Sequence, residues 1–110
     1  MNLRSSIPIL ALSLLAAVPA TAATATPQPV SAYLAMCKTG AKACKYEVVR
    51  ASIFLMSNRD DVSNCLVAKM PNDNDVMTKQ VVDWLSSHPT TGKAETTEAI
   101  QGALMSIYCG

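Results

Sequence analysis

The sequence predicts a small all-α domain of four helices, with an extra short helix as an alternative, that is stabilised by disulfide bonds. Three observations support this fold class. Apolar residues recur at spacings of three and four, as they do along one face of a helix. Glycine is scarce, with four in 110 residues, and the Asn-Gly and Asp-Gly pairs that mark hairpins do not occur. Four cysteines in so short a chain are typical of an exported, disulfide-bonded domain.

Residues 1–25 are expected to be a cleaved secretory signal peptide. "MNLR" supplies a positive charge, "IPILALSLLAAV" an apolar run, and "PATAATA" two Ala-x-Ala cleavage motifs. The apolar run is shorter than the roughly 20 residues that a membrane-spanning helix needs. The first cysteine is Cys37, too late for a lipid anchor at the cleavage region. We therefore expect cleavage between about residues 22 and 25, and a single helical domain over 26–110 with no membrane anchor.

The mature domain is expected to be formally neutral. The whole chain has nine Lys and Arg against eight Asp and Glu, and the signal peptide removes Arg4. Nucleic acids and anionic membrane surfaces select clustered Lys and Arg. Because the sequence has no basic run, we expect neither as a partner.

The four cysteines are expected to form two disulfides. A four-cysteine zinc site usually has paired Cys-x-x-Cys spacings, whereas the gaps between these cysteines are irregular and an exported chain meets an oxidising compartment. Four cysteines allow three pairings, among which the number of cysteines alone does not choose. No metal or other cofactor is expected.

The first two helices are expected on either side of Gly40. "PQPVSAYLAMCKTG" fits a short helix with Ser31 near its start and Gly40 just past its end. "CKYEVVRASIFLMSN" fits a longer helix that ends at Asn58. Its periodicity places one apolar series on a common face: Tyr46, Val49, Ile53 and Met56.

The third helix is expected to begin after Pro71, where Asp73 or Asp75 can cap its first turn. It runs through "VMTKQVVDWLSS" and is stopped by Pro89. The spacing places Trp84 on the core face of this helix and His88 at its C-terminus. A histidine there can interact with the last carbonyl groups of the helix.

The fourth helix is expected to carry Glu95 and Glu98 in its first turn, where they favour the positive end of the helix dipole. Its apolar positions are Ile100, Leu104, Ile107 and Tyr108. Four helices in up-and-down order favour two disulfides, one at each end of the bundle: Cys37 with Cys44, and Cys65 with Cys109. The connection from Arg59 to Asn72 would change this pairing if it folded back.

No catalytic residues are predicted, and we expect a protein that is not an enzyme. The sequence has one histidine, His88, and its neighbours Ser86 and Ser87 are too close in sequence for the usual spatially assembled dyad. The adjacent acids Asp60 and Asp61 are typical of a solvated surface. No glycine-rich phosphate loop occurs.

Several short segments follow one another in a characteristic order: "YLAMC", "CKYEVV", a third cysteine with a polar turn after it, "VVDWLSSHP" and "AIQGALMSIYC". In this order the chain resembles the Tai-type immunity proteins, the periplasmic antidotes to type VI secretion amidase effectors. The resemblance spans residues 31–109. Its most specific parts are two sets of residues: Trp84, Leu85, His88 and Pro89, and then Ala103, Leu104, Tyr108 and Cys109.

The resemblance implies a periplasmic, all-helical, disulfide-bonded inhibitor, often a homodimer, that binds a peptidoglycan amidase and blocks its cleft. Such inhibition needs a rigid framework and a projecting loop but no chemistry from the inhibitor. The connection "SSHPTTGKAE", residues 86–95, is the candidate loop. The expected contacts are Ser87, His88, Thr90, Thr91 and Lys93, with Asp60 and Asp61 as a second candidate surface.

Two other functions remain open from the sequence. Small exported helical proteins with disulfides include periplasmic acid-stress chaperones, which loosen at low pH and expose apolar surface. The other is an adaptor protein of the cell envelope. A chaperone would hold unfolded clients near pH 3, whereas an immunity protein would bind one enzyme near neutral pH.

Overall fold

The computed structural model describes residues 28–110, so the expected signal peptide and its cleavage site lie outside the described residues. Over residues 28–110 the chain forms five α-helices and a one-turn 3₁₀-helix, and no strand longer than a single bridge. The elements are α2 (Val30–Cys37), α3 (Lys42–Asn58), α4 (Asp60–Lys69), α5 (Asn74–Ser86), η2 (Pro89–Thr91) and α6 (Thr96–Cys109). The predicted all-α class is confirmed, and α4 is the extra short helix.

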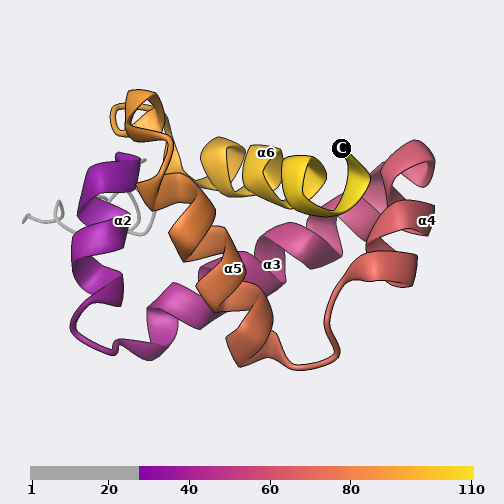
Figure 1. Ribbon diagram of the computed structural model, residues 1–110, viewed down its shortest axis with the longest axis horizontal. Coiled ribbons are helices and arrows are strands. Elements are labelled where there is room, and N and C mark those ends of the chain that lie inside the picture. The colour runs from indigo at the N-terminus through magenta and orange to yellow at the C-terminus, as the bar shows by residue number, and fades with distance from the viewer. Residues whose placement is uncertain (1–27) are drawn as a thin grey trace, which may run out of the picture.

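Helix α3 is the centre of the arrangement, because it packs against each of the other four α-helices. Figure 1 shows α5 crossing in front of α3, α6 running along the top, and α2 and α4 at opposite ends. The loop between α5 and α6 lies at the α2 end. The core between the helices contains large side chains that are almost fully buried: Val30, Tyr33, Val48, Leu55, Leu66, Met77, Val81, Leu85, Ile100 and Leu104.

The buried face of α3 differs from the one that its periodicity suggested. Tyr46 and Ile53 from the predicted series are 55% and 54% exposed. The core is instead contacted by a second series with spacings of four, three and four: Cys44, Val48, Ala51 and Leu55. Both series fit a helical period, so spacing alone does not choose between them. The second series, with Ser52, includes small side chains that let neighbouring helices approach closely.

The ends of the helices follow local chemistry closely. Of the two acids considered as caps for α5, Asp73 is the cap, and its Oδ1 accepts hydrogen bonds from the N–H groups of Asp75 at 2.8 Å and Val76 at 3.4 Å. Glu95 lies just before α6 rather than in its first turn, and its carboxylate accepts from the backbone N–H groups of the next turn. Gly40, after α2, has a φ of 77°, a conformation that other residues adopt only with strain.

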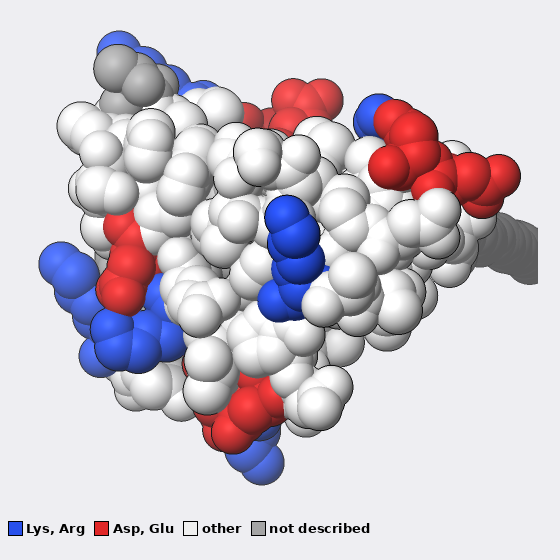
Figure 2. Space-filling model, turned by 45° about the vertical axis from the view of Figure 1, so that its right-hand side comes forward, with Lys and Arg blue, Asp and Glu red and all other residues white. Residues whose placement is uncertain are grey.

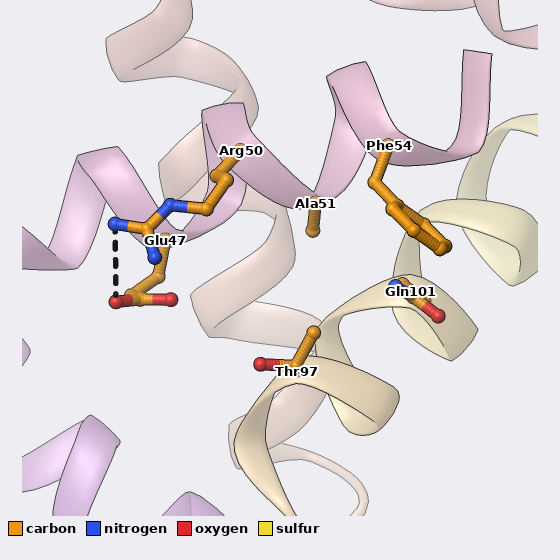
Figure 3. Close-up of a pocket in the computed structure, with 6 residues that line it drawn as sticks. All are labelled: Glu47, Arg50, Ala51, Phe54, Thr97 and Gln101. Atoms are coloured by element: carbon orange, nitrogen blue, oxygen red, sulfur yellow. Dashed lines mark ion pairs between the residues drawn. The ribbon is translucent and has the colours of Figure 1, made fainter. Parts of the chain in front are cut away.

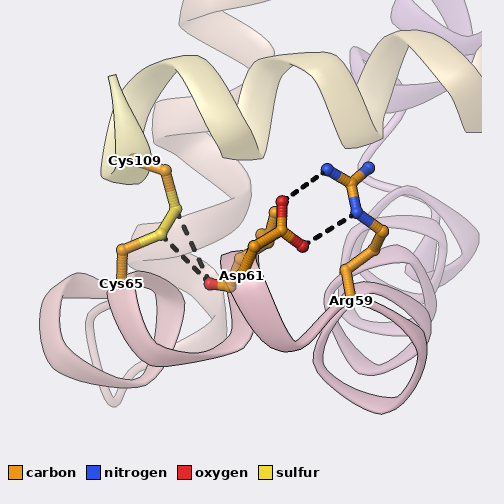
Figure 4. A network of polar contacts seen from close by, with 5 residues as sticks. Arg59, Asp61, Cys65 and Cys109 are labelled. Atoms are coloured by element: carbon orange, nitrogen blue, oxygen red, sulfur yellow. Dashed lines mark hydrogen bonds and ion pairs between the residues drawn. A yellow bond between two sulfur atoms is a disulfide. The ribbon is translucent and has the colours of Figure 1, made fainter.

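The disulfides in the structure are the same two that the helical order favoured. Cys37 pairs with Cys44 across the turn between α2 and α3, with 5.0 Å between their Cα atoms. Cys65 pairs with Cys109, joining α4 to the last turn of α6, with 5.4 Å between Cα atoms. Both sulfurs of the second bond lie close to the carbonyl oxygen of Val62, at 3.1 and 3.7 Å (Figure 4). Because neither sulfur carries a proton, these are packing contacts.

A buried tyrosine links α2 to α3 beside the first disulfide. Tyr33 is fully buried, and its hydroxyl donates a hydrogen bond of 2.7 Å to the backbone carbonyl of Cys44. Burial raises the pKa of Tyr33 well above its ordinary value, and the negative charge of Glu47 raises it further. The phenol therefore stays protonated in the folded protein at a pH where an unfolded tyrosine ionises.

This burial makes the folded protein sensitive to alkali. Above about pH 10 the unfolded chain loses the Tyr33 proton and the folded chain keeps it, so the free energy of unfolding falls as the pH rises. We expect Tyr33→Phe to reduce this alkaline loss, at the cost of about 1 to 2 kcal/mol at neutral pH because the Cys44 carbonyl loses its donor. Urea unfolding at several pH values measures both effects. Tyr46→Phe is the exposed control, and equal alkaline slopes for the two variants would contradict the assignment.

Candidate binding surface

The loop of residues 86–95 is a compact structure between two helices. After α5 ends, η2 forms one turn, and the N–H groups of Gly92 and Ala94 donate to the carbonyls of Pro89 and Thr91 at 3.0 and 2.8 Å. The Thr91 hydroxyl donates to the His88 carbonyl at 2.8 Å. In Figure 1 this loop extends beyond the bundle at the α2 end. It is therefore a projecting surface with internal hydrogen bonds that restrict its backbone.

The base of the loop is a stacked pair of rings. The His88 imidazole lies on the Trp84 indole with 3.8 Å between ring centroids and 15° between planes. The Nδ1 atom of His88 is 2.6 Å from the Trp84 carbonyl oxygen. The histidine thus makes the contact with a C-terminal carbonyl that its position suggested, while its ring remains exposed. Trp84 is half-buried and packs against the core.

The sequence-predicted contacts are gathered on this loop, but they are not equally available. The Ser87 hydroxyl already donates to the carbonyls of Asp83 and Trp84, both at 3.0 Å, and so helps to end α5. Lys93 is exposed, whereas Thr91 is half-buried. Thr90 is the middle residue of η2. Lys93 and the exposed ring of His88 are consequently the most accessible of the side chains described.

Ser87 and His88 do not form a nucleophile and base. Their Oγ and Nδ1 atoms are 3.4 Å apart, and each atom is closer to a backbone carbonyl of α5. An activated serine must donate its proton to the base. Here the hydroxyl faces carbonyl oxygens instead, so this pair ends a helix and does not supply an attacking group.

Asp60 and Asp61 are placed away from the loop. They occupy the first turn of α4, where negative charge is favourable, at the opposite end of the molecule from residues 86–95 (Figure 1). The Arg59 guanidinium donates two hydrogen bonds to the Asp61 carboxylate, from Nε to Oδ1 at 3.1 Å and from Nη2 to Oδ2 at 2.8 Å (Figure 4). The hydrogen bond from Arg59 lowers the pKa of Asp61. The two candidate surfaces are therefore separate, and one acid of the second is already paired.

A surface that the sequence interpretation missed lies on the outer side of α3. Tyr46, Ile53 and Phe54 are each more than half exposed. Beside them a shallow pocket of about 190 Å³ separates α3 from α6, lined by Glu47, Arg50, Ala51, Phe54, Thr97 and Gln101. Figure 3 shows the α3 side chains on one side and the two α6 side chains on the other. The apolar series that includes Tyr46 and Ile53 is the sequence signal for this surface.

Charges on the described surface are mixed. Figure 2 shows small groups of both signs with a broad uncharged area between them. Several opposite charges are paired: Lys79 with Asp83 at 2.7 Å, Lys45 with Asp75 at 3.1 Å and Arg50 with Glu47 at 3.8 Å. This face has no strong single-sign field to steer a charged partner over a distance.

Within residues 28–110, no three or more His, Cys, Asp or Glu side chains gather closely enough to hold a metal ion. None of the described helices is both long and apolar enough to span a bilayer. No family model matches the chain, and neither a curated protein nor a solved structure matches it.

Proposed function

We propose that the mature protein is a periplasmic immunity protein that binds a type VI secretion peptidoglycan amidase and blocks its catalytic cleft. The observation that carries the proposal is the loop of residues 86–95. It projects from the bundle and has internal hydrogen bonds. It also includes His88 and Pro89, which belong to one of the two most specific parts of the Tai-type resemblance. An inhibitor of this kind works by filling a groove, not by reacting with it.

The rigidity of the loop supports an inhibitory role. Ordering a flexible segment on binding reduces affinity, whereas a segment that is already ordered avoids most of that cost. Stacking of His88 on Trp84 fixes the start of the loop, and the Glu95 cap fixes the start of α6. The loop would enter a cleft with little loss of backbone freedom.

The disulfides and the surface charge support the proposed location and mode of recognition. Disulfides form and persist in oxidising compartments such as the periplasm, and both bonds of this domain join helices. Mixed surface charge suits recognition by shape and hydrogen bonding at short range. Neither feature requires a catalytic group in this chain.

Replacing Thr90, Thr91 and Lys93 together by alanine tests the loop. We expect the triple variant to bind its amidase about 30-fold more weakly, because a few side chains near the centre of an interface carry most of the binding energy and losing one of them costs about 2 kcal/mol or more. Co-purification with amidase effectors from the same genome, followed by calorimetry, measures the change. Lys69→Ala, at an exposed position of α4 outside both candidate surfaces, is the control and should leave affinity within about threefold.

Two results would count against the proposal. Unchanged affinity of the triple variant would show that the loop is not the contact surface. Failure of the wild-type protein to bind any candidate amidase would remove the immunity function itself. Retention of unfolded clients near about pH 3, with apolar surface exposed, would then favour an acid-stress chaperone.

A further inference from the structure

We infer that residues 28–31 are a clasp that holds the loop of residues 86–95 in position, so that a segment far from the loop in sequence controls its binding conformation. The inference rests on the proposed function for its link to binding, but its structural part stands independently. Two hydrogen bonds join residues 28–31 to the loop and two more join them to Thr96 directly after it, although more than 60 residues separate the partners in the sequence.

The clasp has two halves on either side of Pro29. Before Pro29, the Gln28 carbonyl accepts two hydrogen bonds from Thr96, one from its N–H at 3.0 Å and one from its hydroxyl at 2.7 Å. After Pro29, the N–H groups of Val30 and Ser31 donate to the carbonyls of Ala94 and Gly92, both at 3.1 Å. Hydrogen bonds to residues 28–31 thus hold the loop at Gly92 and Ala94, and hold Thr96 directly after it.

The hydrogen bonds from Val30 and Ser31 also satisfy N–H groups at the start of α2 that have no partner within the helix. The first amides of a helix have no partner within it, and Pro29, the N-cap residue, offers no side-chain acceptor. The loop carbonyls of Gly92 and Ala94 accept from the first two amides in place of a capping side chain. The loop therefore caps α2, and α2 in turn holds the loop.

Opening the clasp is unfavourable because the residues that form and anchor it are buried. Thr96 is only 2% exposed, and opening would leave its hydroxyl and N–H without the Gln28 acceptor. The side chain of Val30 is fully buried, as is that of Tyr33 one turn later. Because these side chains anchor α2 in the core, the carbonyl at Gln28 and the amide at Ser31 are held in fixed positions against the loop.

This arrangement assigns positioning roles to Ser31, through its backbone, and to Thr96, through its hydroxyl. Neither needs to touch the amidase. Releasing the loop from α2 would leave residues 92–95 free to sample other conformations, and binding would have to order them again. Shortening the mature chain past residue 31 would have the same effect, so the position of the mature N-terminus controls the affinity of the loop.

The sharpest test is Ser31→Pro, which deletes the N–H that donates to Gly92 and also restricts the backbone of Val30 before it. The Ser31 side chain is exposed, and proline is tolerated in the first turn of a helix because no intrahelical bond is lost there. Ser31→Ala keeps the N–H and is the matched control. Thr96→Val removes the hydroxyl at the other half of the clasp, and Thr96→Ser restores it.

Hydrogen exchange of the amides of residues 30 and 96, which donate across the clasp to Ala94 and Gln28, reports opening of the clasp in the free protein. We expect faster exchange by about tenfold or more in Ser31→Pro and Thr96→Val, and near wild-type exchange in Ser31→Ala and Thr96→Ser. Dissociation from the bound amidase should accelerate by about tenfold in the same two variants, whereas global unfolding by urea should change much less.

Unchanged exchange of the amides of residues 30 and 96 in both Ser31→Pro and Thr96→Val would overturn the clasp. Faster exchange with an unchanged dissociation rate would overturn its role in binding. If no amidase binds the wild-type protein, the proposed function fails, while the exchange comparison still decides whether residues 28–31 hold the loop.

Discussion

Removing the Cys65–Cys109 disulfide is expected to destabilise the protein by about 4 kcal/mol, compared with about 2 kcal/mol for the Cys37–Cys44 disulfide. The difference follows from the chain that each bond closes. Cys65 and Cys109 are 44 residues apart in the sequence, whereas Cys37 and Cys44 are only seven apart. A disulfide that closes a longer loop removes more conformational freedom from the unfolded chain. Removing that disulfide therefore lowers the free energy of unfolding by more.

The position of the bond adds to this effect. Cys109 is in the last turn of α6, and Tyr108 beside it is buried and donates a hydrogen bond to Gln80 of α5. Without the bond to α4, this end of α6 has no covalent restraint and frays more readily. Small domains have a free energy of unfolding of only about 5 to 15 kcal/mol. The variant without the Cys65–Cys109 disulfide should therefore be only marginally stable.

Urea unfolding of two double variants measures the difference: Cys65→Ser with Cys109→Ser, and Cys37→Ser with Cys44→Ser. Replacing both partners avoids leaving a free thiol that exchanges with the remaining bond. A larger loss from the Cys37 and Cys44 variant would contradict the expected order and show that local packing around Tyr33 outweighs loop length.

Leu55→Ala is expected to cost about 2 to 5 kcal/mol, whereas Ile53→Ala on the same helix should cost less than about 1 kcal/mol. Leu55 is 2% exposed and its truncation leaves a cavity between α3 and its neighbours. Ile53 is 54% exposed and its truncation leaves none. The two residues are both aliphatic and lie two positions apart, so helix propensity contributes little to the difference.

Thermal or urea unfolding of the two variants distinguishes the two faces of α3. The structure predicts that Leu55→Ala is far less stable than Ile53→Ala. Equal losses, or a larger loss from Ile53→Ala, would mean that the Tyr46 and Ile53 series faces the core after all and that α3 is rotated about its axis.

Much of the fold could be predicted because helix ends depend on local chemistry. Asp73 caps α5, Pro89 follows its end and Gly40 ends the α2 turn, and each acts within a few residues of its own position. Helix α4 was harder to predict, since it is short and its ten residues bury only Val62 and Leu66. The orientation of α3 was not predictable, because two apolar series of equal regularity compete along it.

The candidate site was predictable only in part, for a similar reason. The stacking of His88 on Trp84 follows from their spacing of four, which brings His88, just past the end of α5, next to Trp84 in its last turn. The hydrogen bonds between residues 28–31 and 92–96 join distant segments, and most use only backbone groups that every sequence carries. Side-chain patterns cannot reveal such pairing, whereas the folded structure makes it evident.

The most direct test of the central proposal is inhibition of peptidoglycan cleavage. The mature protein, residues 26–110, is titrated into assays of the amidase effectors encoded in its own genome, beside the triple loop variant. We predict that the activity of one amidase falls to zero near molar equivalence and that the variant needs a large excess to do the same. Full activity of every amidase at a large excess of the wild-type protein would contradict the account.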